Sequence, residues 1–130
     1  MVLVDTSVWI DFFNSQESPY SEKLSELIKG YNRVVICGLI LQEILQGIKD
    51  DRSYKTTRKR LSRLPFIDTH KETYLYAADL YRNLRRKRLT IPPIDVTIAA
   101  IAITNKLPLF TKDVHFEKIA GISELELFNI

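Results

Sequence analysis

The strongest constraint on the fold is the alternation of short apolar runs with longer segments of helical periodicity. Residues 2–5, 33–37 and 107–111 have the length and apolar character of buried strands, and shorter candidates lie at 66–67 and 124–128. Strands that alternate with helices usually form one parallel sheet with right-handed crossover connections. The sequence therefore predicts an α/β fold in which helices flank a parallel sheet.

The expected helices are marked by apolar residues three or four positions apart and by typical start and stop residues. Ser18 and Pro19 open one helix, and Gly30 ends it. The segment 95–105 is apolar nearly all round, so we expect a buried helix there. The residues predicted to form the buried face of the preceding helix are Tyr74, Ala77, Ala78, Tyr81 and Leu84.

Composition favours one globular domain, which we expect to span residues 1–130. No signal peptide and no membrane-length apolar run is recognisable, so no membrane partner is expected. The one cysteine, Cys37, lies in an apolar run, which is typical of a buried thiol in a reducing cytoplasm. The net charge of +3 only weakly favours an anionic partner.

Four acidic residues that are far apart in the sequence are expected to approach one another in this fold. Asp5 and Asp113 each follow a strand, and the carboxyl edge of an open α/β sheet is where ligands bind. Glu43 and Asp95 belong to adjoining helices. Because carboxylates repel each other unless a cation neutralises them, this arrangement predicts a site for Mg²⁺ or Mn²⁺, which take oxygen ligands. Such ions support phosphodiester hydrolysis.

Each acid also has a simpler explanation. Asp5 and Asp95 stand where helix caps are common, although no capping box follows Asp95. Glu43 lies off the apolar stripe of its helix, as a solvent-facing residue would, and Asp113 is a suitable first residue of a turn. These explanations stay open for each residue, but none of them accounts for the four acids together.

Four sequence blocks resemble a known family. Residues 3–11, 42–44, 94–102 and 111–116 are similar, in sequence and in order, to the PIN domain. Within that family the similarity is greatest to the VapC-type ribonuclease toxins of toxin–antitoxin pairs. The blocks extend from one end of the chain to the other. One departure is visible at Arg88-Leu89-Thr90, where relatives often carry glycine after the basic helix.

The resemblance implies a three-layer sandwich with the parallel sheet in strand order 3-2-1-4-5. It also implies a metal-dependent endoribonuclease in the cytoplasm that uses Mg²⁺ or Mn²⁺ and has RNA, such as tRNA or rRNA, as its substrate. A cognate antitoxin and a homodimer are the expected protein partners. By position, the implied metal-binding acids are Asp5, Glu43, Asp95 and Asp113. Ser7, or alternatively Thr6, would orient a water or a phosphate, with Thr111 in a supporting place.

Basic and aromatic side chains suggest where RNA and the antitoxin bind. The candidate RNA-binding residues are Arg82, Arg85, Arg86, Lys87 and Arg88, with a second basic cluster at Arg58, Lys59, Arg60 and Arg63. A solvated helix face is the alternative for both clusters. Trp9, Phe12 and Phe13 are candidates for an antitoxin groove, with core packing as the alternative. Tyr20, Tyr31 and Tyr54 are expected to be more exposed than Tyr74 and Tyr81.

Rival functions are less well matched. An aspartyl-phosphate hydrolase needs a second Asp two residues after the first, where this chain has Ser7. A phospho-acceptor domain would use Lys112, but it lacks the required acid pair on the first loop. A PIN-like module that binds RNA or protein without cutting it remains an alternative, as does a nuclease of the same fold that cleaves DNA.

Overall fold

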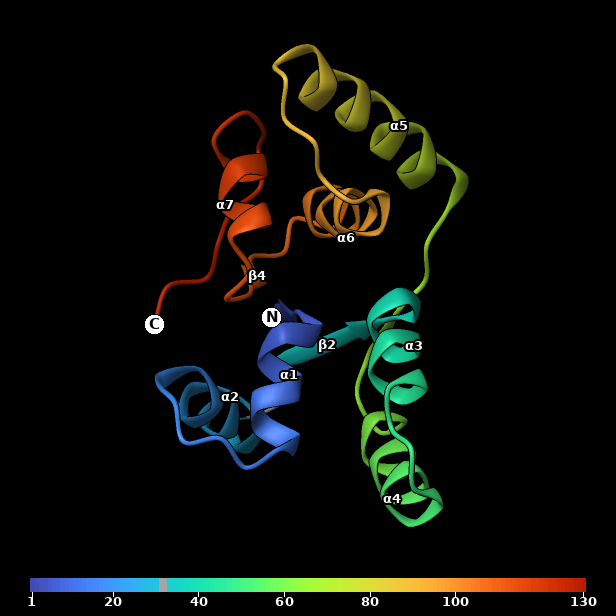
Figure 1. The fold of residues 1–130 in the computed structure, drawn as a ribbon, viewed down its shortest axis with the longest axis vertical. Helices are drawn as coiled ribbons and strands as arrows, with labels where there is room; N and C mark the ends of the chain where they lie inside the picture. Colours follow the sequence, from blue (N-terminus) through green and yellow to red (C-terminus); the bar gives the residue numbers. More distant parts are fainter. Residues whose placement is uncertain (31–32) are drawn as a thin grey trace.

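The computed structural model describes residues 1–30 and 33–130 and places a parallel sheet at the centre of the molecule (Figure 1). In this part of the chain the sheet has four strands, in the order β3-β2-β1-β4. β1 pairs in parallel with both β2 and β4, and β2 pairs in parallel with β3. The strands are β1 (Val2–Val4), β2 (Val34–Cys37), β3 (Phe66–Ile67) and β4 (Leu109–Phe110).

Helices connect the strands and cover both faces of the sheet. In Figure 1 the pair α5 and α6 lies on one side of the strands, and α1 and α2 lie on the other. Both pairs make extensive mutual contact. The helices are α1 (Thr6–Phe13), α2 (Pro19–Lys29), α3 (Gly38–Gln46), α4 (Asp51–Leu61), α5 (Lys71–Arg86), α6 (Pro93–Thr104) and α7 (Val114–Ala120). None of the described helices is long and apolar enough to cross a membrane.

The core forms where the strands meet the apolar helices. Every residue of β1 and β2 is buried, as expected for central strands of a parallel sheet with both faces covered. α6 is buried on almost all sides because it packs against α5, α3 and α7. Burial of this central frame holds the carboxyl ends of β1 and β4, and the amino ends of α1, α6 and α7, in fixed relative positions.

The predicted strand order is confirmed for the strands that form. The expected fifth strand, 124–128, lies beside β4 as predicted but makes only one isolated parallel bridge, between Leu109 and Leu127. The Leu109 N–H donates to the Glu126 carbonyl and the Phe128 N–H donates to the Leu109 carbonyl, each at 2.9 Å. β4 itself is only two residues long, so it offers too few backbone groups for a longer fifth strand to pair with.

Three local predictions are wrong. Tyr74 is 56% exposed and Ala78 is also exposed, because the buried stripe of α5 is centred one position away and runs through Thr73, Ala77, Leu80 and Leu84. Asp95 does not begin its helix: α6 starts at Pro93 after a Pro92 cap, which places Asp95 in the first turn. The cap explanation for Asp95 is therefore excluded. Tyr20 and Tyr54 are half-buried and therefore less exposed than Tyr74, so the opposite expectation is wrong. Tyr31 lies outside the described residues.

The unusual turn after α5 has a clear geometric basis. Arg88 has φ of 60°, in the left-handed region that favours glycine. The Leu89 N–H donates to the Leu84 carbonyl at 2.9 Å and the Arg88 N–H to the Arg85 carbonyl at 3.0 Å, which is the Schellman pattern of a helix end. The chain therefore ends this helix with an arginine at a position whose backbone conformation favours glycine.

Candidate active site

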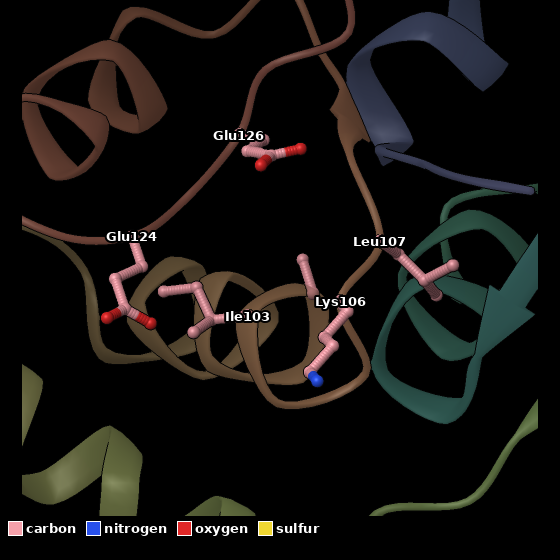
Figure 2. Close-up of a pocket in the computed structure, with 6 residues that line it drawn as sticks. Ile103, Lys106, Leu107, Glu124 and Glu126 are labelled. Carbon is pink, nitrogen blue, oxygen red and sulfur yellow. The ribbon is translucent and has the colours of Figure 1, made fainter.

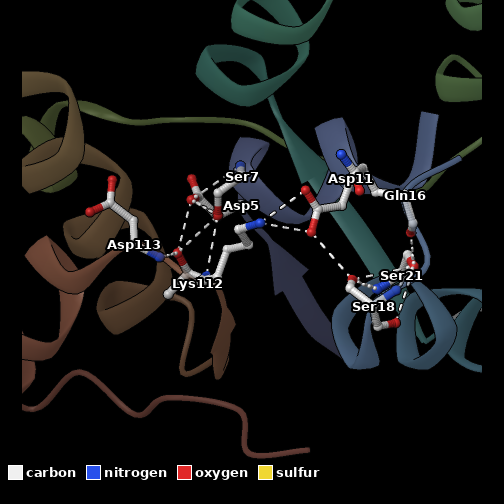
Figure 3. Close-up of polar contacts among 9 residues, drawn as sticks. Asp5, Ser7, Asp11, Gln16, Ser18, Ser21, Lys112 and Asp113 are labelled. Carbon is white, nitrogen blue, oxygen red and sulfur yellow. Dashed lines mark hydrogen bonds and ion pairs between the residues drawn. The ribbon is translucent and has the colours of Figure 1, made fainter. Parts of the chain in front are cut away.

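The first part of the site is a hydrogen-bonded network around Asp5. This residue follows β1, is 5% exposed and caps α1 by accepting a bond from the Ser7 backbone N–H. The Ser7 hydroxyl also donates to Asp5 Oδ2 at 2.8 Å (Figure 3). The Thr111 hydroxyl donates to the same oxygen at 2.9 Å. Each hydroxyl oxygen in turn accepts a backbone N–H, from Lys112 and Asp113 respectively. The network ties the end of β4 to the end of β1.

Glu43 joins the site from α3. The Thr6 hydroxyl donates to Glu43 Oε1 at 3.0 Å, which links the start of α1 to the middle of α3. Glu43 is half-buried, so the interpretation of this residue as an ordinary solvent-facing side chain is wrong. The apolar stripe of α3 is anchored by Ile40 and Ile44, and this anchoring sets the direction in which Glu43 points.

The remaining acids meet at a histidine. Asp113 caps α7 by accepting the His115 backbone N–H, and the His115 ring lies between the two carboxylates. His115 Nδ1 is 2.9 Å from Asp95 Oδ2 and 3.4 Å from Asp113 Oδ1. One ligand atom from each of these three residues lies within 4.8 Å of the others, a spacing that suits a metal ion.

All four acids share one structural pattern. Each has one carboxylate oxygen that accepts a hydrogen bond from a neighbouring residue of the site. Across residues 1–30 and 33–130, no hydrogen bond reaches the other oxygen of any of the four. Metal-binding carboxylates are commonly oriented in this way, with one oxygen held by the protein and the other left for the ion.

The acids also influence one another electrostatically. Partial burial raises the pKa of Glu43 above its ordinary value, the Thr6 hydrogen bond partly opposes this, and the charges of Asp5 and Asp95 raise the pKa further. Partial burial likewise raises the pKa of Asp95, against the opposing His115 hydrogen bond, with further contributions from the Asp113 and Asp5 charges. The site therefore concentrates negative charge that a cation would stabilise.

An ion pair braces the loop between β4 and α7. Lys112 Nζ lies 2.8 and 2.9 Å from the two carboxylate oxygens of Asp11, which is buried on α1 (Figure 3). The Ser18 hydroxyl donates to Asp11 Oδ2 at 3.3 Å. Lys112 is therefore engaged away from the acids, which argues against the phosphoryl-binding lysine that a phospho-acceptor domain requires.

A cavity lined by two glutamates and a lysine lies elsewhere. It has a volume of about 460 Å³ and is lined by the end of α6 and by the segment beside β4 (Figure 2). Leu107 in its wall precedes β4, so the cavity is at the amino edge of the sheet, opposite the four acids. Ligand sites of open parallel sheets lie at the carboxyl edge, so the acidic network is the better candidate.

Comparison with known proteins agrees with this geometry. The family model described as "PIN domain" matches residues 2–122. The chain belongs to the PIN domain family. Ribonuclease VapC11 of Mycobacterium tuberculosis is 32% identical over 129 residues, which cover 97% of this chain and 96% of that protein. The predicted resemblance to VapC-type PIN ribonucleases is thus confirmed.

Solved structures give the same fold. The crystal structure of VapBC2 from Rickettsia felis, bound to a DNA fragment from their promoter, matches with a TM-score of 0.81 and 26% identity over 100% of this chain and 99% of that one. VapBC-5 from Mycobacterium tuberculosis, of the VapBC family of toxin–antitoxin systems, matches with a TM-score of 0.73 and 21% identity, covering 99% and 98%. The α/β fold with a helix-flanked parallel sheet is that of a PIN domain.

The structure brings all seven predicted site residues of this PIN domain to one edge of the sheet. It also adds His115 and the Asp11–Lys112 pair, to which the sequence interpretation gave no role. The spacing of His115, two residues after Asp113 in a predicted helix start, was the available signal. The pairing of Asp11 with Lys112 spans 101 residues and left no local signal.

The residues of the predicted basic and aromatic surfaces differ in their exposure. All five candidate RNA-binding residues of α5 and its end are exposed. Trp9 is 2% exposed and stacks on Phe13, so its core interpretation is confirmed. Phe12 and Phe13 are half-buried, with the Arg60 guanidinium 5.4 Å from each ring centre.

Proposed function

We propose that this protein is a divalent-metal-dependent endoribonuclease and the toxin of a type II toxin–antitoxin pair. The observation that carries the proposal is the set of four carboxylates, each with one oxygen fixed and one oxygen available. VapC ribonucleases that resemble this chain over almost its full length support the reaction class. A non-catalytic binding module would have no need for four carboxylates that are each oriented by a hydrogen bond.

The donor set fits a hard divalent cation. Asp5, Glu43, Asp95 and Asp113 would hold Mg²⁺ or Mn²⁺ through their carboxylate oxygens. When bound, such an ion supplies a Lewis acid that neutralises phosphate charge and makes an attacking water more acidic. Net hydrolysis adds the water oxygen to phosphorus, breaks one phosphorus–oxygen bond of the RNA backbone and protonates the departing oxygen.

The hydroxyl residues then have defined positioning roles. Ser7 and Thr111 hold Asp5 in one orientation, and Thr6 does the same for Glu43. Because the Ser7 hydroxyl hydrogen is directed at Asp5, we assign this residue to the orientation of the carboxylate rather than to a direct contact with water or phosphate. The Asp11–Lys112 pair fixes the loop that carries Thr111 and Asp113.

Substrate RNA is proposed to approach across the exposed basic end of α5. The candidate contacts are Arg82, Arg85, Arg86, Lys87 and Arg88. Phosphate contacts of this kind give salt-dependent affinity, so Arg85→Ala should reduce the slope of log affinity against log salt by about 1. A structured RNA such as tRNA or rRNA in the cytoplasm is the substrate we propose to test first.

Protein partners are proposed from the exposed apolar surface. Tyr74, Leu75 and Ile94 are 56%, 59% and 47% exposed. Exposed apolar surface of this kind typically marks an interface. We assign it to a homodimer, so that Leu75→Glu should shift the protein to monomer in light scattering. A cognate antitoxin is the second partner, because VapBC assemblies contain structurally similar chains.

Cleavage of a defined RNA pool tests the function. Purified protein should produce discrete fragments with Mn²⁺ or Mg²⁺, no fragments with EDTA, and none when Asp5→Asn replaces the wild type. The matched control is Glu126→Gln, at the opposite edge of the sheet. Equal cutting by Asp5→Asn and wild type would contradict the proposed site, and a parallel assay with DNA of the same sequence decides between the two nucleic acids.

A further inference from the structure

We propose that His115 supplies a nitrogen ligand to the bound cation, beside Asp95 and Asp113, and thereby makes the site prefer transition-metal ions such as Mn²⁺ over Mg²⁺. This inference rests on the metal-dependent function proposed above. It concerns a residue outside the four acids and gives the site a chemical selectivity that an all-oxygen set lacks.

The ring nitrogen stands at ligand spacing from two carboxylate oxygens. His115 Nδ1 lies 2.9 Å from Asp95 Oδ2 and 3.4 Å from Asp113 Oδ1. A six-coordinate ion with ligands at about 2.1 Å places neighbouring ligand atoms about 3 Å apart. The three atoms can therefore contact one ion with small side-chain adjustments, and the free oxygens of the two aspartates stay available to the same ion or to solvent.

The backbone holds His115 in this place independently of the ring contacts. The His115 N–H donates to Asp113 Oδ1 at 2.9 Å, so the residue sits in the capped first turn of α7. Phe116 and Ile119 anchor that helix in the core. The imidazole is 35% exposed, and no hydrogen bond to its Nε2 exists in the described part of the chain. Water can therefore hydrogen-bond to Nε2 while Nδ1 faces the carboxylates.

Nitrogen in the donor set changes which ion is favoured. Carboxylates, carbonyls and water suit Mg²⁺, whereas imidazole is a ligand for first-row transition metals. Removing the nitrogen should therefore weaken the binding of Mn²⁺ more than the binding of Mg²⁺. If His115 only donated a hydrogen bond to Asp95, it would orient the carboxylate for either ion. Replacing His115 would then weaken the binding of both ions equally.

Pulsed electron paramagnetic resonance of the Mn²⁺-loaded protein, without RNA, tests the ligand directly. We expect a ¹⁴N coupling in the wild type that disappears in His115→Gln. The matched control is His70→Gln, because His70 is the other histidine of the chain and lies exposed at the start of α5. This control should keep the coupling. Bound Mn²⁺ without a ¹⁴N signal in the wild type would overturn the inference and leave the proposed nuclease site intact.

Competition calorimetry with Mn²⁺ and Mg²⁺ supplies the second readout. His115→Gln should weaken Mn²⁺ binding by about tenfold or more and change Mg²⁺ binding by no more than about twofold. His115→Asp should retain binding but lose the preference for Mn²⁺. Equal weakening of both ions would assign His115 a purely orienting role, contrary to the inference. A wild type that binds neither ion would contradict both this inference and the proposed function.

Discussion

Two regions of the molecule carry clustered acids, and they differ in how those acids are held. At the carboxyl edge, hydroxyls from distant parts of the chain fix one oxygen each of Asp5 and Glu43. At the amino edge, Glu124 and Glu126 line a cavity with Lys106. None of the hydrogen bonds or ion pairs found in residues 1–30 and 33–130 involves the side chains of these three residues.

The two regions differ in whether hydrogen bonds orient the carboxylates, and not only in how many acids they contain. Orienting a carboxylate costs side-chain entropy, and that cost is reduced in advance only where neighbouring groups already hold it. At the carboxyl edge the bonds join residues up to 106 positions apart in sequence, so the fold itself provides the orientation. We therefore expect the two regions to respond very differently to equivalent substitutions.

The largest expected contrast is in catalysis. Asp95→Asn should lower the cleavage rate by about 100- to 1000-fold, because the loss of a cation ligand removes several kcal/mol of transition-state stabilisation. Glu126→Gln makes the same chemical change in the other region and should stay within about twofold of the wild type. Single-turnover rates at saturating Mn²⁺ measure both. A larger loss of cleavage rate in Glu126→Gln than in Asp95→Asn would indicate that the active site lies at the amino edge of the sheet.

A smaller effect is expected at the ion pair that braces the catalytic loop. Lys112→Met leaves the buried Asp11 carboxylate with only the Ser18 hydroxyl, so we expect a loss of about 1–3 kcal/mol in unfolding free energy. Urea denaturation measures this, with Lys118→Met as the exposed control. The double variant Asp11→Asn with Lys112→Met should regain part of the loss. A stable Lys112→Met would show that the pair does not brace the loop.

The third contrast concerns pH. The raised pKa of Glu43 means that the metal-free folded state binds a proton more tightly than the unfolded chain, so stability falls as pH rises from the ordinary Glu pKa through the raised value. Glu43→Gln should remove this loss. Because Glu43 is only half-buried, the gain at neutral pH should be about 0.5 kcal/mol, or about 2 °C in Tm.

Thermal melts of metal-free Glu43→Gln and wild type across pH test this linkage. The difference between them should be largest near neutral pH and should vanish below the ordinary Glu pKa, where the wild-type carboxyl is protonated as well. Glu126→Gln, at the other edge, should show no such pH-dependent gain. A Glu43→Gln variant that is less stable than the wild type at neutral pH would contradict the proposed cost of keeping this partly buried carboxylate charged.

A similarly small effect is expected at Lys106, beside the amino-edge cavity. Its φ of 55° lies in the left-handed region, and the Leu107 N–H donates to the Ala102 carbonyl at 2.9 Å to close α6. Lys106→Gly should relieve the strain and stabilise the protein by about 0.5–1 kcal/mol. Lys106→Ala keeps a Cβ and should not. Equal melting temperatures for the two variants would argue against strain at this turn.

How much the sequence could predict differs between these features. The strand order was implied by the family resemblance, whereas the positions of Asp5 and Asp113 follow from apolar runs and from the rule that parallel strands end at one edge. The two-residue strands β3 and β4 and the single bridge at Leu127 depend on neighbour pairing, which no local pattern encodes. Tyr74 was assigned to the core because a helical stripe shifted by one residue satisfies nearly the same spacing.

The site was predictable to the level of residues but not of contacts. The acids and hydroxyls were recognisable from their sequence blocks, whereas the partners of each oxygen depend on side-chain geometry across the sheet. Asp11 and Lys112 each look like ordinary surface charges in the sequence, and only the approach of α1 to the loop before α7 reveals the pair. His115 similarly gains significance from the proximity of α6 to α7.

An anomalous difference map from crystals soaked in Mn²⁺ tests the central claim most directly, because the scattering locates the ion among the carboxylates. We predict a peak between Asp5, Asp95 and Asp113 at the carboxyl edge of the sheet, within ligand distance of their carboxylate oxygens. A peak at Glu124 and Glu126 with none at the carboxyl edge would contradict the account.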